Sequence, residues 1–279
     1  MKNVNKVLIV LLTLLHGCSS DTVNEQKEND NDNLKKLRLV SKIKSLNLKP
    51  WEKYGDTLIY KDKKLRFSLL EGQSYQIQFY EYNQNGKIST IYHRGDLNRN
   101  EFNPNTFDIA AYKVSEDIDI ETYIYENDVI SERHRGRYIH YFTYDEQNRV
   151  KSVDQFDTIG QSFYEIWVFN YNGDKLESIR RNNLETGKTT IYTYEFDDMV
   201  NPFYALKEEF GLVELETSRA LYYNSVDGMI FKNNVKKRFE NGELTYSADF
   251  EYDGGYPIRI SWTYYKLNKS NVENYSYRD

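Results

Sequence analysis

Several residue types are scarce in this sequence, and each scarcity excludes a class of protein. The 279 residues include one cysteine, Cys18, so no disulfide can staple the chain and a packed core must supply its stability. Charged residues make up 29% of the chain, and the mean hydropathy is -0.79. These values exclude a multi-span helical membrane protein, whereas 39% apolar content excludes a wholly disordered chain. The formal net charge of -6 disfavours nucleic acid as a partner, because like charges repel.

The longest apolar run lies near the N-terminus and has the pattern of an export signal. Two lysines precede the run at residues 7–15, which is about half of the roughly 20 residues that a spanning helix needs. The tetrad that follows, Leu15-His16-Gly17-Cys18, resembles a bacterial lipobox. The resemblance implies cleavage before Cys18, diacylation of its thiol and acylation of the new amino terminus. His16 stands where a small or aliphatic residue is usual, and an ordinary signal peptide with a free Cys18 is the alternative.

We expect three segments: a lipoprotein signal peptide at 1–17, a disordered tether at 18–36 and a single β domain at 37–279. Residues 19–36 contain no aromatic side chain and only two aliphatic ones, Val23 and Leu34, too few to offset the entropy of ordering. The acidic residues behind Cys18 resemble signals that send some lipoproteins to the outer face of the outer membrane, and a solvated spacer fits them equally well. The expected location is the cell envelope, with a lipid anchor in the outer membrane and its face left open.

The body of the chain repeats one phrase: an aromatic residue, any residue and a tyrosine, then a polar turn, a lysine or arginine, and two spaced aliphatic residues. Clear copies lie at 80–91, 142–153 and 169–179, and weaker copies lie at 123–129, 192–197 and 250–258. Alternate aromatic residues suit a pleated, half-buried strand, and Asn, Asp and Gly tolerate positive φ. Each phrase therefore predicts a β-hairpin.

These hairpins predict an all-β fold, a large antiparallel meander of about six or seven β-hairpins. Twelve or more strands exceed what a strongly twisted open sheet usually holds, so we expect the sheet to curl into a barrel-like or strongly curved shape. The stretch 37–48 fits a strand or a helix, and we favour the strand. Insertions at about 95–116 and 207–241 interrupt the hairpins, and loops of that length often carry function.

The phrase resembles the YD repeat of bacterial surface and toxin-shell proteins. More closely, residues 37–265 resemble a bacterial family of lipoproteins of unknown function with a porin-like β fold. The lipobox and the segments 194–203 and 252–257 carry this resemblance. It implies a curled antiparallel sheet of successive hairpins and no particular activity. The strand face with Asp249, Glu251 and Arg259 cannot meet lipid, so a domain hung from a lipid is favoured over a membrane-spanning barrel.

The abundance of tyrosine, 26 residues, allows two interpretations. The tyrosines that recur in the phrase form a ladder for stacking sugars, or they pack against neighbouring strands with their hydroxyls in water at the sheet edge. We favour packing. The ladder comprises Tyr82, Tyr144, Tyr171, Tyr194 and Tyr252.

Three other aromatic residues, Tyr256, Trp262 and Tyr264, are the candidate ligand-stacking residues, because we expect them in exposed loops.

Standard catalytic and nucleotide-binding motifs are absent from the sequence. His134 and His140 could in principle share a metal, but we favour the interpretation that they are polar residues at strand ends. Asp117, Asp119 and Glu121 share one strand face, an arrangement that suits glycosidase carboxylates but more often marks a solvated edge. We therefore predict no catalytic residue, no cofactor and no metal site.

The leading hypothesis is a lipid-anchored envelope protein that is not an enzyme and whose β domain binds a glycan or a protein. The first alternative is a structural or assembly component of an envelope complex. The second is an unrecognised carbohydrate-active enzyme, which a pair of carboxylates facing one cleft would support.

Overall fold

The computed structural model describes residues 38–45, 55–71, 75–95, 102–114, 118–211 and 231–278. All of them belong to one compact unit, Arg38–Asp279. The expected signal peptide, the tether and Cys18 lie outside the described residues. Within the described residues, no helix is long and apolar enough to cross a membrane.

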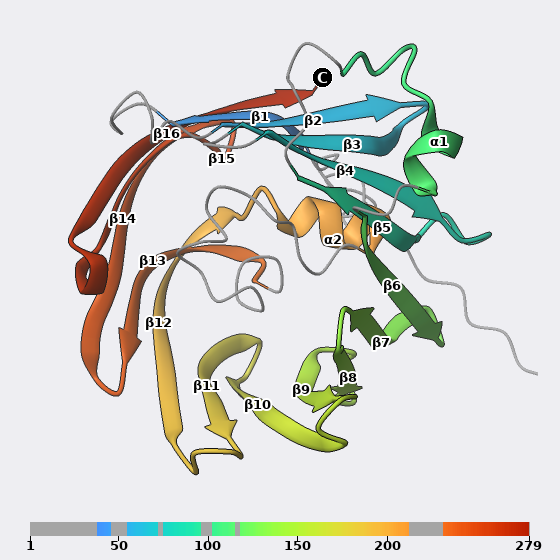
Figure 1. Cartoon of the computed structure of the whole chain (residues 1–279). Helices are drawn as coiled ribbons and strands as arrows, with labels where there is room; N and C mark the ends of the chain where they lie inside the picture. Colours follow the sequence, from blue (N-terminus) through green and yellow to red (C-terminus); the bar gives the residue numbers. More distant parts are fainter. Residues whose placement is uncertain are drawn as a thin grey trace, which may run out of the picture. The chain divides into compact units, whose positions relative to one another are not determined.

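The unit is built almost entirely of antiparallel strands (Figure 1). The strands are β1 (Leu39–Ser45), β2 (Gly55–Lys61), β3 (Lys64–Glu71), β4 (Tyr75–Tyr82), β5 (Ile88–Arg94), β6 (Asp119–Glu126), β7 (Val129–Arg135), β8 (Tyr138–Tyr144), β9 (Val150–Asp157), β10 (Ser162–Asn172), β11 (Lys175–Asn183), β12 (Thr189–Val200), β13 (Asn233–Glu240), β14 (Glu243–Asp253), β15 (Tyr256–Tyr264) and β16 (Lys269–Arg278). Two short helices, α1 (Ile109–Lys113) and α2 (Tyr204–Phe210), and a 3₁₀ turn, η3 (Tyr265–Leu267), complete the described elements.

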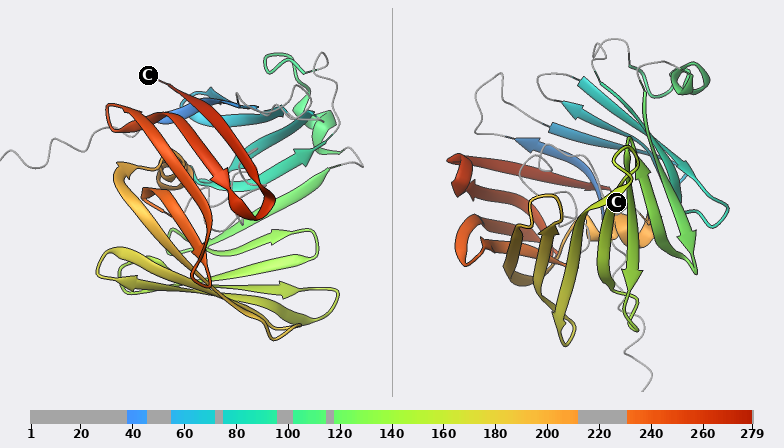
Figure 2. Two further views of the ribbon diagram at one scale, coloured as in Figure 1. Left: turned by 90° about the vertical axis from the view of Figure 1, so that its left-hand side faces the viewer. Right: turned by 60° about the horizontal axis from the view of Figure 1, so that its bottom comes forward.

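Each strand pairs with its neighbours in the chain, and the first and last strands pair with each other. Leu39 lies opposite Arg278 in the β1–β16 pair, so the meander closes into a barrel, which Figure 2 shows from two further sides. The predicted all-β, barrel-like meander is confirmed. The hairpin count was too low, because the described residues form sixteen strands and several of these lack the tyrosine phrase.

The turns explain how the hairpins form. Asn127 and Asp128 join β6 to β7 with φ angles of 51° and 63°, the double positive φ of a two-residue turn that matches the twist of its strands. Gly86 and Gly173 also have positive φ in the turns after β4 and β10. The Asn, Asp and Gly clusters of the phrase therefore form hairpin turns, as the sequence predicted.

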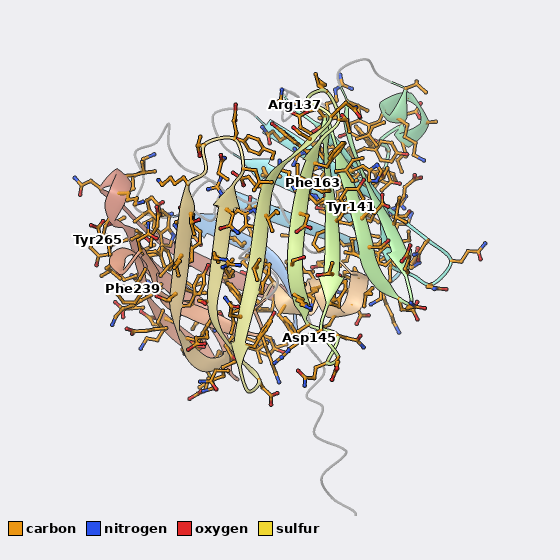
Figure 3. All side chains as sticks on the ribbon, turned by 90° about the horizontal axis from the view of Figure 1, so that it is seen from below. Arg137, Tyr141, Asp145, Phe163, Phe239 and Tyr265 are labelled. Carbon is orange, nitrogen blue, oxygen red and sulfur yellow. The ribbon has the colours of Figure 1, made fainter. Side chains whose placement is uncertain are left out.

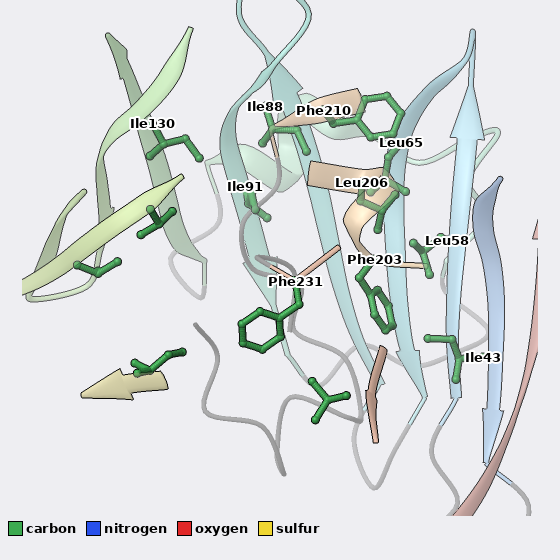
Figure 4. Packing of buried hydrophobic residues seen from close by; sticks show 14 of the residues in the cluster. Ile43, Leu58, Leu65, Ile88, Ile91, Ile130, Phe203, Leu206, Phe210 and Phe231 are labelled. Carbon is green, nitrogen blue, oxygen red and sulfur yellow. The ribbon is translucent and has the colours of Figure 1, made fainter. Parts of the chain in front are cut away.

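The inner face of the barrel is apolar and carries most of the core. In β12, for example, Thr190 and Tyr192 are buried, whereas Ile191 and Thr193 between them are exposed. Helix α2 lies within the ring of strands, where Leu206 and Phe210 pack against residues of β2 and β3 (Figure 4). The interior of the barrel around α2 is therefore a packed core.

Helix α1 covers the outer face instead. Its Tyr112 joins a second apolar cluster with Phe67 and Phe79 of β3 and β4, and the Tyr112 hydroxyl donates to the backbone oxygen of Ile77 at 2.9 Å. The expected insertion at 95–116 thus supplies a cover for one part of the wall. Part of the other expected insertion, 207–241, is not a loop, because Asn233–Glu240 forms strand β13.

Candidate functional site

The repeated tyrosines are tied to the backbone of the barrel wall. The hydroxyl of Tyr82 donates to the carbonyl oxygen of Leu65 at 2.6 Å. The hydroxyls of Tyr125, Tyr144 and Tyr171 donate to the carbonyl oxygens of Ile88, Ile130 and Val150 at 2.7, 2.9 and 3.0 Å. Burial raises the pKa of Tyr144 and of Tyr171 to about 12. The ladder therefore packs against the core, as favoured, but its hydroxyls bind neighbouring strands instead of reaching water.

Tyr194 and Tyr252 complete the ladder. Tyr194 packs against the inner core, and the Tyr252 hydroxyl donates to the carboxylate of Asp197. Both contacts are with the protein itself, as for the other tyrosines of the ladder.

The three candidate stacking residues lie in strand β15 and not in exposed loops. Tyr256 and Trp262 are each 3% exposed, and Tyr264 is half-buried. The Trp262 ring nitrogen Nε1 donates to Glu273 Oε1 at 2.8 Å. The expected exposure was wrong because strand alternation places Ile260, Trp262 and Tyr264 together on the apolar inner face.

The two neighbouring histidines point to opposite sides of the wall. His134 lies opposite Ile139 across β7 and β8, and its Nε2 is 2.5 Å from Glu132 Oε2. His140 lies opposite Arg133, so it shares the inner face with that arginine. The two histidines therefore cannot share a metal. Within the described part of the chain, no group of three or more His, Cys, Asp and Glu residues is arranged to hold a metal ion.

A row of polar side chains follows the inner face near one end of the barrel. Directly opposed residues on β3 to β6 are Ser68, Gln78, His93 and Asp119, and on β7 to β10 they are Arg133, His140, Gln155 and Glu165. We call these eight residues the polar row. Because cross-strand partners share a face, the row forms a polar band on the inner face of the barrel.

Hydrogen bonds connect the first part of the row. Ser68 Oγ donates to Gln78 Oε1 at 2.5 Å, and Gln78 Nε2 lies 3.2 Å from His93 Nδ1. His93 Nε2 in turn lies 3.2 Å from Glu121 Oε2. Such a connected network satisfies polar groups that would be costly to bury alone.

Glu121 lies at the centre of this network and is 2% exposed. Arg133 donates to it from Nε at 2.8 Å and from Nη2 at 3.4 Å, and the Tyr123 hydroxyl also donates to it. Burial alone would raise the pKa of Glu121, but Arg133 and His93 more than offset that effect and hold its pKa well below the usual range.

The solvated edge expected at Asp117, Asp119 and Glu121 was therefore wrong for Glu121. A closed barrel has no edge strand, and β6 is paired on both sides. Asp119 lies on the same inner face, whereas Asp117 lies outside the described residues.

A cavity of about 450 Å³ opens beside the second part of the row, at the end of the barrel that carries the β7–β8 turn. We call it the arginine cavity and this end the Arg137 end; Figure 3 shows Arg137 and Asp145 at opposite ends of the wall. The cavity is lined by Asp119, Arg133, Arg135, Gly136, Arg137, Tyr138, His140, Gln155, Glu165, Trp167 and Arg181.

Ion pairs, and a contact between a guanidinium group and an aromatic ring, position the side chains that line the cavity. Arg135 Nε donates to Asp119 Oδ2 at 2.9 Å, and Arg181 donates to both carboxylate oxygens of Glu165. The Arg181 guanidinium lies 5.1 Å from the Trp167 ring centre. Paired arginines of this kind are oriented before a ligand arrives.

His140 has an uncharged ring in this surrounding. Burial, and then the nearby Arg133 guanidinium, lower the pKa of His140 to about 4. Its Nδ1 is buried and makes no hydrogen bond with the described residues. Sequence patterns did not predict this site as a whole, because its members are separated along the chain and meet only through strand pairing.

A second cavity, of about 710 Å³, lies at the Asp145 end. Its lining includes Tyr125, Tyr144 and Tyr171, whose hydroxyls already bind backbone carbonyls. Because these hydroxyls already stabilise the barrel wall, the arginine cavity is the stronger candidate site.

Comparison with known proteins supports the architecture. No family model and no curated protein matches the chain. Among solved structures, a porin-like protein from Bacteroides uniformis is similar with a TM-score of 0.53 and 11% identity, over 86% of this chain and 96% of that one.

Two further structures are more distant. A porin-like protein from Bacteroides vulgatus matches with a TM-score of 0.36 and 15% identity, over 86% of this chain and 99% of that one. A chain of the TcdB2-TccC3-Cdc42 structure matches with a TM-score of 0.25 and 10% identity, over 84% of this chain and 16% of that one. The Bacteroides uniformis likeness shows that this chain shares the fold of a porin-like protein.

Proposed function

We propose that this chain is a lipid-anchored protein of the cell envelope whose barrel binds a glycan in the arginine cavity. The observation that carries the proposal is the cavity lining, which combines planar polar groups with the rings of Tyr138 and Trp167. Planar amide, carboxylate and guanidinium groups bind vicinal hydroxyls through paired hydrogen bonds, and aromatic rings accept the apolar face of a sugar. A volume of about 450 Å³ suits a small ligand or the end of a chain.

The cell-envelope part of the proposal rests on the export-signal pattern of the N-terminal sequence and on the charged outer face of the barrel wall. The lipobox-like tetrad ending in Cys18 supplies an attachment point for lipid. The outer wall carries charged pairs, such as Arg259 Nη1 with Glu251 Oε1 at 3.1 Å, and these groups favour water over hydrocarbon.

Lipid attachment is tested by expressing the full chain with a clickable fatty acid. We expect the label to enter the wild-type protein and to be lost in Cys18→Ser, which should also leave the membrane fraction. Equal labelling of the two proteins would contradict the anchor.

Ligand binding is tested on a glycan array with two matched variants. Arg137 is 49% exposed and its Nη2 lies 3.5 Å from Asp157 Oδ2, whereas Arg259 is 46% exposed and pairs with Glu251 outside the cavity. We expect Arg137→Ala to weaken glycan binding at least fivefold and Arg259→Ala to leave it unchanged. Equal binding by both variants would place the ligand elsewhere.

One observation favours a second candidate, a carbohydrate-active enzyme. Asp119 and Glu165 both line the arginine cavity, which is the convergence of carboxylates that such an enzyme needs. Each is bound by an arginine, however, so their arrangement orients guanidinium groups better than it supplies a free acid and base. Release of new reducing ends from a bound glycan, lost in Glu165→Gln, would establish the enzyme instead.

A further inference from the structure

The arginine cavity concentrates positive charge in an acidic protein. Four arginines line it, three from the β7–β8 hairpin and one, Arg181, from β11. Two carboxylates, Asp119 and Glu165, line it with them. The chain as a whole has a formal net charge of -6, so this lining departs from the average surface.

In most ion pairs of the cavity, the carboxylate is more deeply buried than the arginine that binds it. The side chain of Glu121 is 2% exposed, whereas that of Arg135, 3.7 Å away, is 24% exposed. The side chain of Glu165 is 4% exposed and that of Arg181 is 32% exposed.

Two further ion pairs lie at the cavity. The side chain of Asp157 is 13% exposed against 49% for Arg137, and Asp119 differs from the rest because it is 46% exposed. In three of these four pairs, the group presented to the cavity is therefore the guanidinium. A guanidinium held from behind keeps its outward N–H groups oriented for a second acceptor.

His140 adds an acceptor at the same place. Its Nδ1 is buried without a hydrogen bond to the described residues, so on the neutral ring this nitrogen can accept a hydrogen bond from a ligand. A buried nitrogen of this kind is best satisfied by a donor such as a sugar hydroxyl.

We infer that the glycan recognised by the arginine cavity is acidic, with the carboxylate or sulfate of one sugar bound by Arg137 and Arg181, and with a hydroxyl of that sugar donating a hydrogen bond to His140. This inference rests on the proposed function and narrows it to a ligand class. Arginine forks match both anionic groups, so the chemistry that they share is an oxyanion on a sugar ring.

The test measures binding to acidic saccharides and to their neutral forms by calorimetry at pH 7 and low salt. The probes are trigalacturonate and its methyl ester, and a chondroitin sulfate tetrasaccharide and its desulfated, methyl-esterified form. The full-length protein is used in detergent, as wild type, Arg137→Gln, His140→Gln and the control Arg259→Gln.

We expect at least one acidic saccharide to bind at least tenfold more tightly than its neutral form, and the two acidic probes to tell carboxylate from sulfate recognition. Arg137→Gln should reduce binding of the acidic form at least fivefold with little effect on the neutral form, and His140→Gln should weaken both. Arg259→Gln should change neither, and added salt should reduce the preference.

Equal affinity for acidic and neutral forms would overturn the inference but leave glycan binding intact. Failure of every probe to bind would overturn the inference together with the proposed function. Binding of an acidic form that is insensitive to Arg137→Gln and to His140→Gln would show that the arginine cavity is not the site.

Discussion

The recurring tyrosine of the phrase is explained by two contacts that one repeat makes with the next. The hydroxyls of Tyr144 and Tyr171 donate to backbone carbonyls of the preceding hairpin, and the rings of Tyr82 and Tyr171 receive the cation that follows the preceding turn. Arg149 lies 4.1 Å from the ring centre of Tyr171, and its Nη1 donates to the carbonyl of Gly173 at 2.6 Å. Lys64 lies 4.7 Å from the ring centre of Tyr82 in the same way. In these copies of the phrase, one repeat therefore stabilises the next.

Removing the hydroxyl of one such tyrosine should have a measurable cost. We expect Tyr144→Phe to lower the free energy of unfolding by about 1 kcal/mol, because the Ile130 carbonyl loses its donor. Tyr144→Ala should cost about 3 kcal/mol, because the ring is lost as well. Urea unfolding gives both values, and Tyr265→Phe, at a ring that is 49% exposed, is the control. Unchanged stability of Tyr144→Ala would refute a structural role for the ladder.

His140 should make the barrel sensitive to mild acid. Its pKa is lowered from 6.5 to about 4 in the folded protein, so the unfolded chain takes up a proton first as the pH falls. The contribution of His140 to stability is therefore fully present above pH 6.5 and is lost towards pH 4, a decrease of about 2–3 kcal/mol.

We expect His140→Gln to show a smaller loss of stability than the wild type between pH 7 and 4.5, measured by urea unfolding. Groups elsewhere titrate equally in both proteins, so the difference isolates the histidine. Parallel pH profiles would show that the imidazole is not kept neutral by its surroundings.

At the scale of elements, α2 illustrates a helix that its surroundings create. Seven residues are too few for a stable helix in water, so packing inside the barrel must supply its stability. Asn201 holds its start, because its Oδ1 accepts from the backbone N–H of Phe203 at 3.0 Å. Gly211 ends it with a φ of 72°, and a Cβ there would lie 2.7 Å from the Tyr125 hydroxyl.

Truncating a side chain of α2 should destabilise the whole barrel. Leu206 is 0% exposed and lies in the inner core, so we expect Leu206→Ala to cost about 2–5 kcal/mol in urea unfolding. Leu267→Ala in η3, where the side chain is 53% exposed, should cost less than about 0.5 kcal/mol. Similar values for the two variants would mean that α2 is not part of the cooperative core.

Sequence patterns predicted local structure here better than they predicted which face of the sheet a side chain lies on. The turn residues and alternating aromatics located the hairpins, because these signals act within a few residues. Strand β13 was missed, since Lys236 and Lys237 make it read as a polar insertion. The orientation of Trp262 was also missed, because period two shows that residues share a face but not which face is inside.

The polar row was beyond prediction for the same reason. His140 and Glu165 lie in one row because both are paired with Gln155 of β9. This pairing depends on the register of the strands, which the spacing of residues along the chain does not show. The alternation of Glu121 with Tyr123 did offer one signal that the carboxylate faces the core.

For the whole molecule, the decisive feature is the pairing of β1 with β16. It removes both sheet edges, so the described strands offer no unpaired ladder to other chains. It also buries Ile43, which is 1% exposed, between β2 and β16.

Deleting β1 should therefore open the barrel. We expect a protein of residues 37–279 to unfold like the full chain, and a protein of residues 46–279 to lose several kcal/mol of stability and to self-associate through β2 and β16. Thermal unfolding and light scattering test both expectations. A monomeric 46–279 with an unchanged melting temperature would show that closure contributes little.

The same pairing makes the order of the strands around the barrel cyclic. Because Leu39 and Arg278 are direct partners, the two ends of the domain lie about one strand spacing apart and a short turn can join them. The domain then becomes a ring that can be cut at any tight turn, for example between Gly173 and Asp174, without breaking a strand pair. A circular permutant opened there would keep every neighbour of every strand, while the proposed lipid attachment point could be moved to a chosen place on the rim.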